Sequence, residues 1–154
     1  MSAGERRPVV VDASVGIQLF VQEAHSEAVH ALFDQLNGEP PLALYVPDLF
    51  YIECANILLK YAQRFNRSEA EGLADLADLA NLALLATPTA SLMQDAYALA
   101  AEHGLTAYDA CYAVLALRLG APLVSVDGDL LNLKTADLVT QTPQAFLEEL
   151  DYGG

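Results

Sequence analysis

The sequence predicts an α/β fold in which a central, mainly parallel sheet is flanked by helices. Short apolar, β-branched runs alternate along the chain with longer segments whose apolar residues recur every three or four positions. Strands that alternate with helices in this way form parallel neighbours, and the helices then cover both faces of the sheet. No linker or internal repeat interrupts the pattern, so we expect residues 1–154 to form a single domain.

The first half of the chain is predicted to begin with a strand at residues 8–11, Pro-Val-Val-Val, which ends at Asp12. Ser14 can cap a helix that runs to about residue 22, and a second helix is predicted over residues 24–36. Residues 42–46 form the next predicted strand. Asp48 is a candidate N-cap for the helix that follows it and runs to about residue 65.

In the second half, Ser68 and Glu71 have the spacing of a capping box and begin a helix with leucines three residues apart. Thereafter short strands and helices continue to alternate. Strands are predicted at residues 82–86, 123–126 and 137–140, and helices at residues 91–103, 108–119 and 142–150.

The net charge is −14, from 7 Lys and Arg against 21 Asp and Glu. This balance argues against a broad basic surface that binds nucleic acid or anionic lipid. It leaves open a nucleic-acid enzyme whose metal ions supply positive charge. Two cysteines are too few for a disulfide framework, and no uncharged run reaches the ~18 residues of a membrane span. We therefore expect a cytoplasmic protein with no membrane association.

Four acidic residues lie where strands end or where the next helix begins. Asp12 and Asp127 end two strands, Glu53 lies in the helix after the second strand, and Asp109 lies in the first turn of a helix. Each has a structural alternative, as a helix cap, a turn residue or a helix-start residue. Ligands bind beyond the carboxyl ends of parallel strands, so we expect the four carboxylates to meet at one edge of the sheet.

Four carboxylates in one small cleft repel one another unless a positive charge lies between them. Hard oxygen donors without His or Cys are typical of Mg²⁺ or Mn²⁺ sites. Such a site binds phosphate oxygens and lowers the pKa of a bound water. The pattern therefore predicts a divalent-metal site that binds phosphate oxygens and prepares a water for in-line attack.

Four short blocks of sequence surround these acids. They are Val-Val-Asp-Ala-Ser at 10–14, Ile-Glu-Cys-Ala-Asn-Ile-Leu at 52–58, Gly-Leu-Thr-Ala-Tyr-Asp-Ala at 104–110 and Ser-Val-Asp-Gly-Asp-Leu at 125–130. The third is the most specific. Over residues 9–147 the chain resembles PIN-domain proteins of the VapC-like toxin group. The resemblance implies a three-layer sandwich and an endoribonuclease that depends on Mg²⁺ or Mn²⁺. It also implies the toxin of a toxin–antitoxin pair, commonly a homodimer, silenced by a small antitoxin protein.

The resemblance assigns roles residue by residue. Asp12, Glu53, Asp109 and Asp127 would be the catalytic, metal-binding quartet, with Asp12 and Asp109 as first choices for direct ligands. Ser14 would be an accessory hydroxyl near the metal. Ser125 stands where the family usually has Thr and keeps the hydroxyl. Asp129 is a neighbouring alternative for the fourth acid, and we prefer Asp127 because it lies at the strand end.

Lys60 and Arg64 share one helical face with Glu53 and could guide RNA toward the site, although cations are also common at a solvated helix end. A phosphoacceptor receiver or a haloacid-dehalogenase-type phosphatase is a second reading. The chain lacks the paired acids that these proteins need after the first strand. A third reading is a non-catalytic PIN-like protein-interaction module, but such a module has no need of clustered acids.

Overall fold

The computed structural model describes residues 5–39 and 41–153. At its centre is a five-stranded sheet in which all strands run parallel, in the order β3-β2-β1-β4-β5. The parallel α/β fold predicted from the alternating pattern is therefore confirmed. The strands are β1 (Arg7–Val11), β2 (Leu42–Pro47), β3 (Leu85–Thr87), β4 (Leu123–Val124) and β5 (Thr140–Gln141).

The strand order contains one reversal of direction. The chain first builds the sheet outward from β1 to β3, and then returns to place β4 on the other side of β1. In open parallel sheets such a switch point leaves a crevice at the carboxyl ends of the two central strands. In this sheet the switch point lies between β1 and β4, the strands that Asp12 and Asp127 follow.

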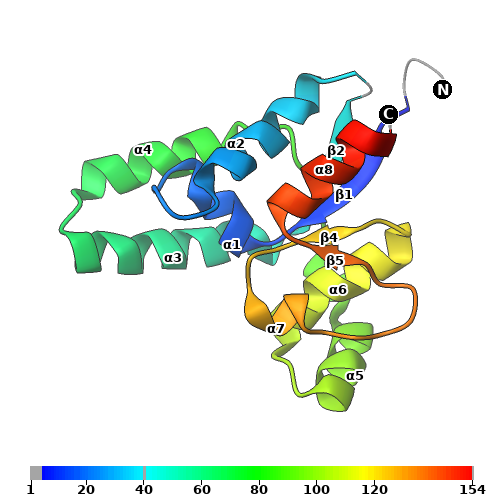
Figure 1. Cartoon of the computed structure of the whole chain (residues 1–154). Coiled ribbons are helices and arrows are strands. Elements are labelled where there is room, and N and C mark those ends of the chain that lie inside the picture. Colours follow the sequence, from blue (N-terminus) through cyan, green and yellow to red (C-terminus); the bar gives the residue numbers. More distant parts are fainter. Residues whose placement is uncertain (1–4, 40, 154) are drawn as a thin grey trace.

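Helices cover both faces of the sheet (Figure 1). On one face α6 (Ala107–Leu119) packs against β1 and β2, and α5 (Met93–His103) packs on α6; on the other face α2 (Ser26–Asp34) lies against α8 (Pro143–Gly153). Because α6 lies between the sheet and α5, every residue from Ala110 to Ala116 is buried. This burial fixes the helix that carries Asp109.

The helices α3 (Leu49–Phe65) and α4 (Glu69–Ala80) form a hairpin that extends away from the sheet (Figure 1). Asn66 ends α3 with a left-handed backbone (φ 54°). Ser68 caps α4 by accepting a hydrogen bond from the Glu71 amide at 3.1 Å, as its sequence spacing predicts. Glu53 lies near the sheet end of this hairpin.

Some element boundaries differ from the sequence predictions. The helix expected to reach residue 22 is one turn, α1 (Ala13–Gly16), followed by a 3₁₀ turn (Ile17–Leu19). The strand expected at residues 137–140 begins only at Thr140, because Asp137 adopts a left-handed turn conformation (φ 68°). The short helix α7 (Gly128–Leu131) was not expected. None of the described helices is long and apolar enough to cross a membrane.

Candidate metal centre

The residues that follow β1 and β4 begin the site. Val11 pairs with Val124, so Asp12 and Ser125, the next residues along, are neighbours across the two strands. The Ser125 hydroxyl donates a hydrogen bond to Asp12 Oδ2 at 2.8 Å. The parallel register thus joins two positions that are 113 residues apart in the sequence.

Asp12 is a buried carboxylate, 4% exposed, that accepts three hydrogen bonds. Besides Ser125, the Ser14 hydroxyl donates to Oδ1 at 2.7 Å and the Val15 amide donates to Oδ1 at 3.3 Å. Burial raises the pKa of Asp12 to about 6, although these hydrogen bonds oppose the rise. The Val15 contact also makes Asp12 the N-cap of α1. The prediction that Ser14 would cap this helix is wrong, because the Ser14 hydroxyl binds Asp12 instead.

Three further carboxylates form a cluster that we call the acidic trio: Asp109, Asp127 and Asp129. One oxygen from each lies within 4.8 Å of the others. The Thr106 hydroxyl caps α6 by accepting from the Asp109 amide at 3.1 Å, which fixes Asp109 in the first turn. Asp127 caps α7 by accepting from the Asp129 amide at 3.2 Å. The unexpected helix α7 therefore brings Asp129 into the cluster beside Asp127.

The pKa of Asp109 is raised to about 6, first by partial burial and then by repulsion from Asp127, Glu53 and Asp129. None of the salt bridges among the described residues joins a Lys or Arg to Asp12, to Glu53 or to the acidic trio. Residues 5–39 and 41–153 thus provide no ion pair that offsets this repulsion.

Glu53 approaches the trio from α3. It is half-buried, and burial raises its pKa. The hydroxyl of Tyr112 donates a hydrogen bond to Glu53 Oε1 at 2.5 Å, which opposes that rise. Tyr112 lies three residues after Asp109 on α6, so one helix face presents both side chains. The three-residue spacing from Asp109 indicates in the sequence that Tyr112 shares its helix face, but not that it contacts Glu53.

The two serines connect Asp12 to the segment that carries Asp127. The Val126 amide donates to Ser14 Oγ at 3.3 Å, and the Asp127 amide donates to Ser125 Oγ at 3.0 Å. Each serine thus donates to the Asp12 carboxylate while accepting from the chain after β4. These contacts hold the ends of β1 and β4 in one fixed arrangement.

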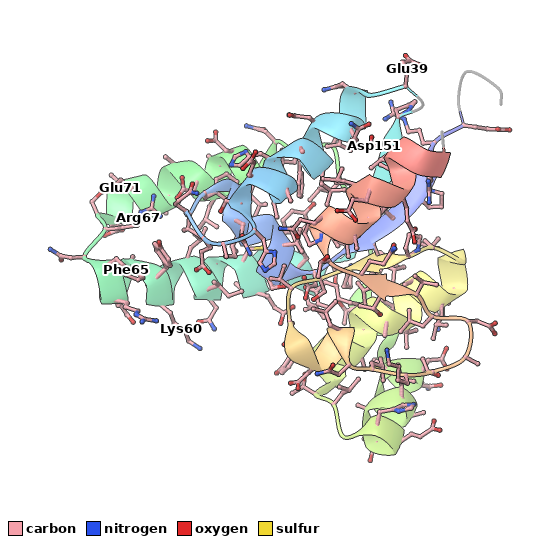
Figure 2. The ribbon with its side chains drawn as sticks, viewed as in Figure 1. Glu39, Lys60, Phe65, Arg67, Glu71 and Asp151 are labelled. Atoms are coloured by element: carbon pink, nitrogen blue, oxygen red, sulfur yellow. The ribbon has the colours of Figure 1, made fainter. Side chains whose placement is uncertain are left out.

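Lys60 and Arg64 lie elsewhere on the surface. Both are exposed, and both line a groove of about 480 Å³ with Gln22, Glu23 and aromatic residues of α3. Figure 2 shows Lys60 projecting outward from α3. None of the predicted site acids lines this groove.

The donor set fits a divalent cation. Every candidate ligand is a carboxylate oxygen, and the oxygens of the trio are close enough to share one ion. Carboxylates without His or Cys donors favour Mg²⁺ or Mn²⁺, and such an ion would offset the mutual repulsion of the acids. Burial raises the pKa of the thiols of Cys54 and Cys111, which disfavours the thiolate form that binds metals, and neither belongs to the acidic trio.

Comparison with known proteins identifies the family. The sequence profile of the PIN domain matches residues 9–135. Ribonuclease VapC3 of Pyrobaculum aerophilum is 37% identical over 134 residues, which cover 86% of this chain and 98% of that protein. Ribonuclease VapC12 of Mycobacterium tuberculosis is 30% identical over 122 residues, or 79% and 88% of the two chains.

Solved structures agree with the sequence relatives. PAE2754 of Pyrobaculum aerophilum superposes with a TM-score of 0.67 at 28% identity, covering 96% of this chain and 99% of that one. VapBC2 of Rickettsia felis, bound to a DNA fragment from its promoter, gives a TM-score of 0.61 at 11% identity, over 88% and 98% of the chains; this likeness concerns the fold alone. With a profile match over most of its length and a close curated relative, the chain belongs to the PIN-domain family.

Proposed function

We propose that this protein is a metal-dependent endoribonuclease that hydrolyses RNA phosphodiester bonds and acts as the toxin of a toxin–antitoxin pair. The observation that supports the proposal is the gathering of the acidic trio, Asp12 and Glu53 at the switch point of the sheet, with no ion pair to a Lys or Arg in the part of the chain that the structure describes. The names of the two ribonuclease relatives support the choice of RNA as substrate.

In this proposal Asp109 and Asp127 hold the metal, with Asp12 as a further direct ligand and Asp129 as a ligand or an alternative to Asp127. Mg²⁺ or Mn²⁺ bound there would lower the pKa of a coordinated water and place positive charge beside the phosphate oxygens. Ser14 and Ser125 keep Asp12 in place through the hydrogen bonds described above. Glu53, oriented by Tyr112, would complete the site by binding the metal directly or through a water.

The proposal includes two protein partners. A small antitoxin would silence the toxin, and the net charge of −14 suits a partner with a basic segment. A second copy of the chain would form a homodimer through exposed apolar side chains of α3, α5 and α6. Ile52, Met93, Tyr97 and Tyr108 are 58–75% exposed. We place this single-domain protein in the cytoplasm, with its RNA substrate.

The direct test is cleavage of a panel of tRNA, ribosomal RNA fragments and single-stranded RNA, with Mg²⁺, Mn²⁺ or EDTA. Purified wild type and Asp109→Asn are compared, since this variant keeps the shape of the side chain and removes its charge. We expect cleavage that needs metal, is lost in the variant and leaves no 2′,3′-cyclic phosphate, because water is the nucleophile. Wild-type cleavage in EDTA, or full activity of Asp109→Asn, would overturn the proposal. Absence of Mn²⁺ binding by calorimetry would favour the interaction-module reading.

A further inference from the structure

Asp129, one member of the acidic trio, lines a cavity to which the proposed hydrolysis assigns no role. Its volume is about 400 Å³, within the range of ligand pockets. One wall is the end of α5 and the loop that leads to Asp109, and the other is α7 and the segment after it. The lining residues are His103, Gly104, Leu105, Asp129, Asn132 and Leu133, together with Lys134. Both walls therefore continue directly into segments that carry the trio.

Most basic side chains among the described residues already have a partner within the protein. Arg67 pairs with Glu71 and Asp75 at the tip of the α3–α4 hairpin (Figure 2), and Arg118 pairs with Asp95. The remaining arginines also have partners. Arg6 donates to backbone carbonyls, and Arg7 and Arg64 lie over phenylalanine rings.

The two lysines, Lys60 and Lys134, differ from these arginines. Neither forms a salt bridge with another described residue. Lys60 lies in the groove on α3 that contains none of the acids. Lys134 shares its cavity with Asp129, a member of the trio. A protein of charge −14 has few means to attract a phosphate chain, so a cation beside the metal centre has a disproportionate effect on where RNA binds.

We propose that this cavity is a subsite for the nucleotide next to the scissile phosphate, and that Lys134 binds its backbone phosphate. His103 and Asn132 add hydrogen-bonding groups to the same walls and suit the sugar and phosphate oxygens. This inference rests on the proposed function, because it assumes that RNA reaches the trio. It assigns RNA binding to the α7 side of the site, in addition to the face of α3 that carries Lys60 and Arg64.

The test measures the salt dependence of RNA binding. Fluorescence anisotropy follows a short labelled single-stranded RNA, with Mg²⁺ present and RNA integrity checked on gels. Lys134→Met should make the slope of log affinity against log salt shallower by about 0.7, the contribution of one phosphate contact on a single strand. If both proteins bind equally at about 1 M salt, this difference in slope makes Lys134→Met bind the RNA about fivefold more weakly than wild type at about 0.1 M.

The matched control is Arg118→Met, which changes the net charge equally but removes a cation already paired with Asp95. We expect this control to keep the wild-type slope, and Lys134→Arg to restore it. Equal slopes for wild type and Lys134→Met, or the same loss in Arg118→Met, would overturn the subsite. Failure of the proposed function is a distinct result, in which wild type neither binds nor cleaves any RNA tested.

Discussion

Replacement of Tyr112 by Phe is a narrow perturbation of the site. Tyr112 is 1% exposed, and its ring packs in the core, so Phe keeps the packing and removes only the hydroxyl. That hydroxyl makes the single side-chain hydrogen bond that Glu53 receives among the described residues. Without it the Glu53 carboxylate is free to turn from the trio toward solvent. Tyr112 is thus a positioning residue that acts through Glu53.

The expected size of the effect follows from the type of contact. A hydrogen bond to a charged group contributes about 1.5–3 kcal/mol. A change of about 1.4 kcal/mol in binding free energy is a tenfold change in affinity. If the whole energy of this hydrogen bond is lost from Mn²⁺ binding, the Mn²⁺ affinity therefore falls by about 10- to 100-fold. Loss of partners that orient metal ligands has effects of the same order, roughly 10–100-fold. We therefore predict this range for the Mn²⁺ dissociation constant, with little change in the melting temperature of the metal-free protein.

The assay is calorimetric titration of Mn²⁺ into wild type, Tyr112→Phe, Glu53→Gln and the double variant. If Tyr112 acts through Glu53, the double variant binds Mn²⁺ like Glu53→Gln alone. Tyr61→Phe is the control, since Tyr61 lies on α3 in the groove away from the acids. Additive losses in the double variant, or unchanged affinity in Tyr112→Phe, would refute the positioning role.

Four further predictions concern stability and assembly. Burial raises the pKa of Asp12 from 3.8 to about 6. Between these pH values the unfolded protein loses the Asp12 proton while the folded metal-free protein keeps it, so the free energy of unfolding falls by up to about 3 kcal/mol as pH rises. In Asp12→Asn the difference between the unfolding free energies measured in urea at pH about 4 and about 7 should be smaller than in wild type. An unchanged difference would contradict the raised pKa of Asp12. Gly16→Ala should cost about 1–3 kcal/mol in urea unfolding, because its Cβ would lie 2.6 Å from Cζ of buried Phe50; wild-type stability would show that the site relaxes freely. Ser68→Ala should lower the free energy of unfolding by about 1 kcal/mol, because α4 loses its N-cap hydrogen bond. An unchanged unfolding free energy would show that this cap does not stabilise the protein. Tyr97→Asp should convert the proposed homodimer to a monomer in light scattering, whereas a persistent dimer would place the interface elsewhere.

Much of the site's location was predictable because it follows from the alternation of strands and helices. The apolar run that ends at Asp12 and the run that ends before Asp127 both read as buried parallel strands. The carboxyl ends of such strands share one sheet edge, so the pattern predicts that both acids lie at that edge, and the pairing of β1 with β4 then brings them together. The cap at Ser68 was equally local, since its spacing to Glu71 specifies the hydrogen bond.

What the sequence could not supply are contacts that depend on how distant elements pack. The hydrogen bond between Tyr112 and Glu53 joins residues 59 positions apart on two helices. Asp48 was predicted to cap α3 with its side chain, but the carboxylate accepts hydrogen bonds from Thr89 instead, a partner 41 residues away. Asp129 joins the trio only because α7 turns it toward Asp109. Each of these depends on tertiary placement, which periodicity does not encode.

The central claim is that the acidic trio, with Asp12 and Glu53, holds the metal ion on which RNA hydrolysis depends. One paired measurement tests this claim most directly. Mn²⁺ binding by calorimetry and the Mn²⁺ dependence of RNA cleavage are measured on wild type, Asp109→Asn and Asp95→Asn, the last an exposed acid of α5 paired with Arg118. The account predicts that half-maximal cleavage occurs at the Mn²⁺ dissociation constant in wild type and Asp95→Asn, and that Asp109→Asn loses both binding and cleavage. Cleavage by Asp109→Asn at the wild-type rate, or half-maximal cleavage at an Mn²⁺ concentration unrelated to binding, would contradict it.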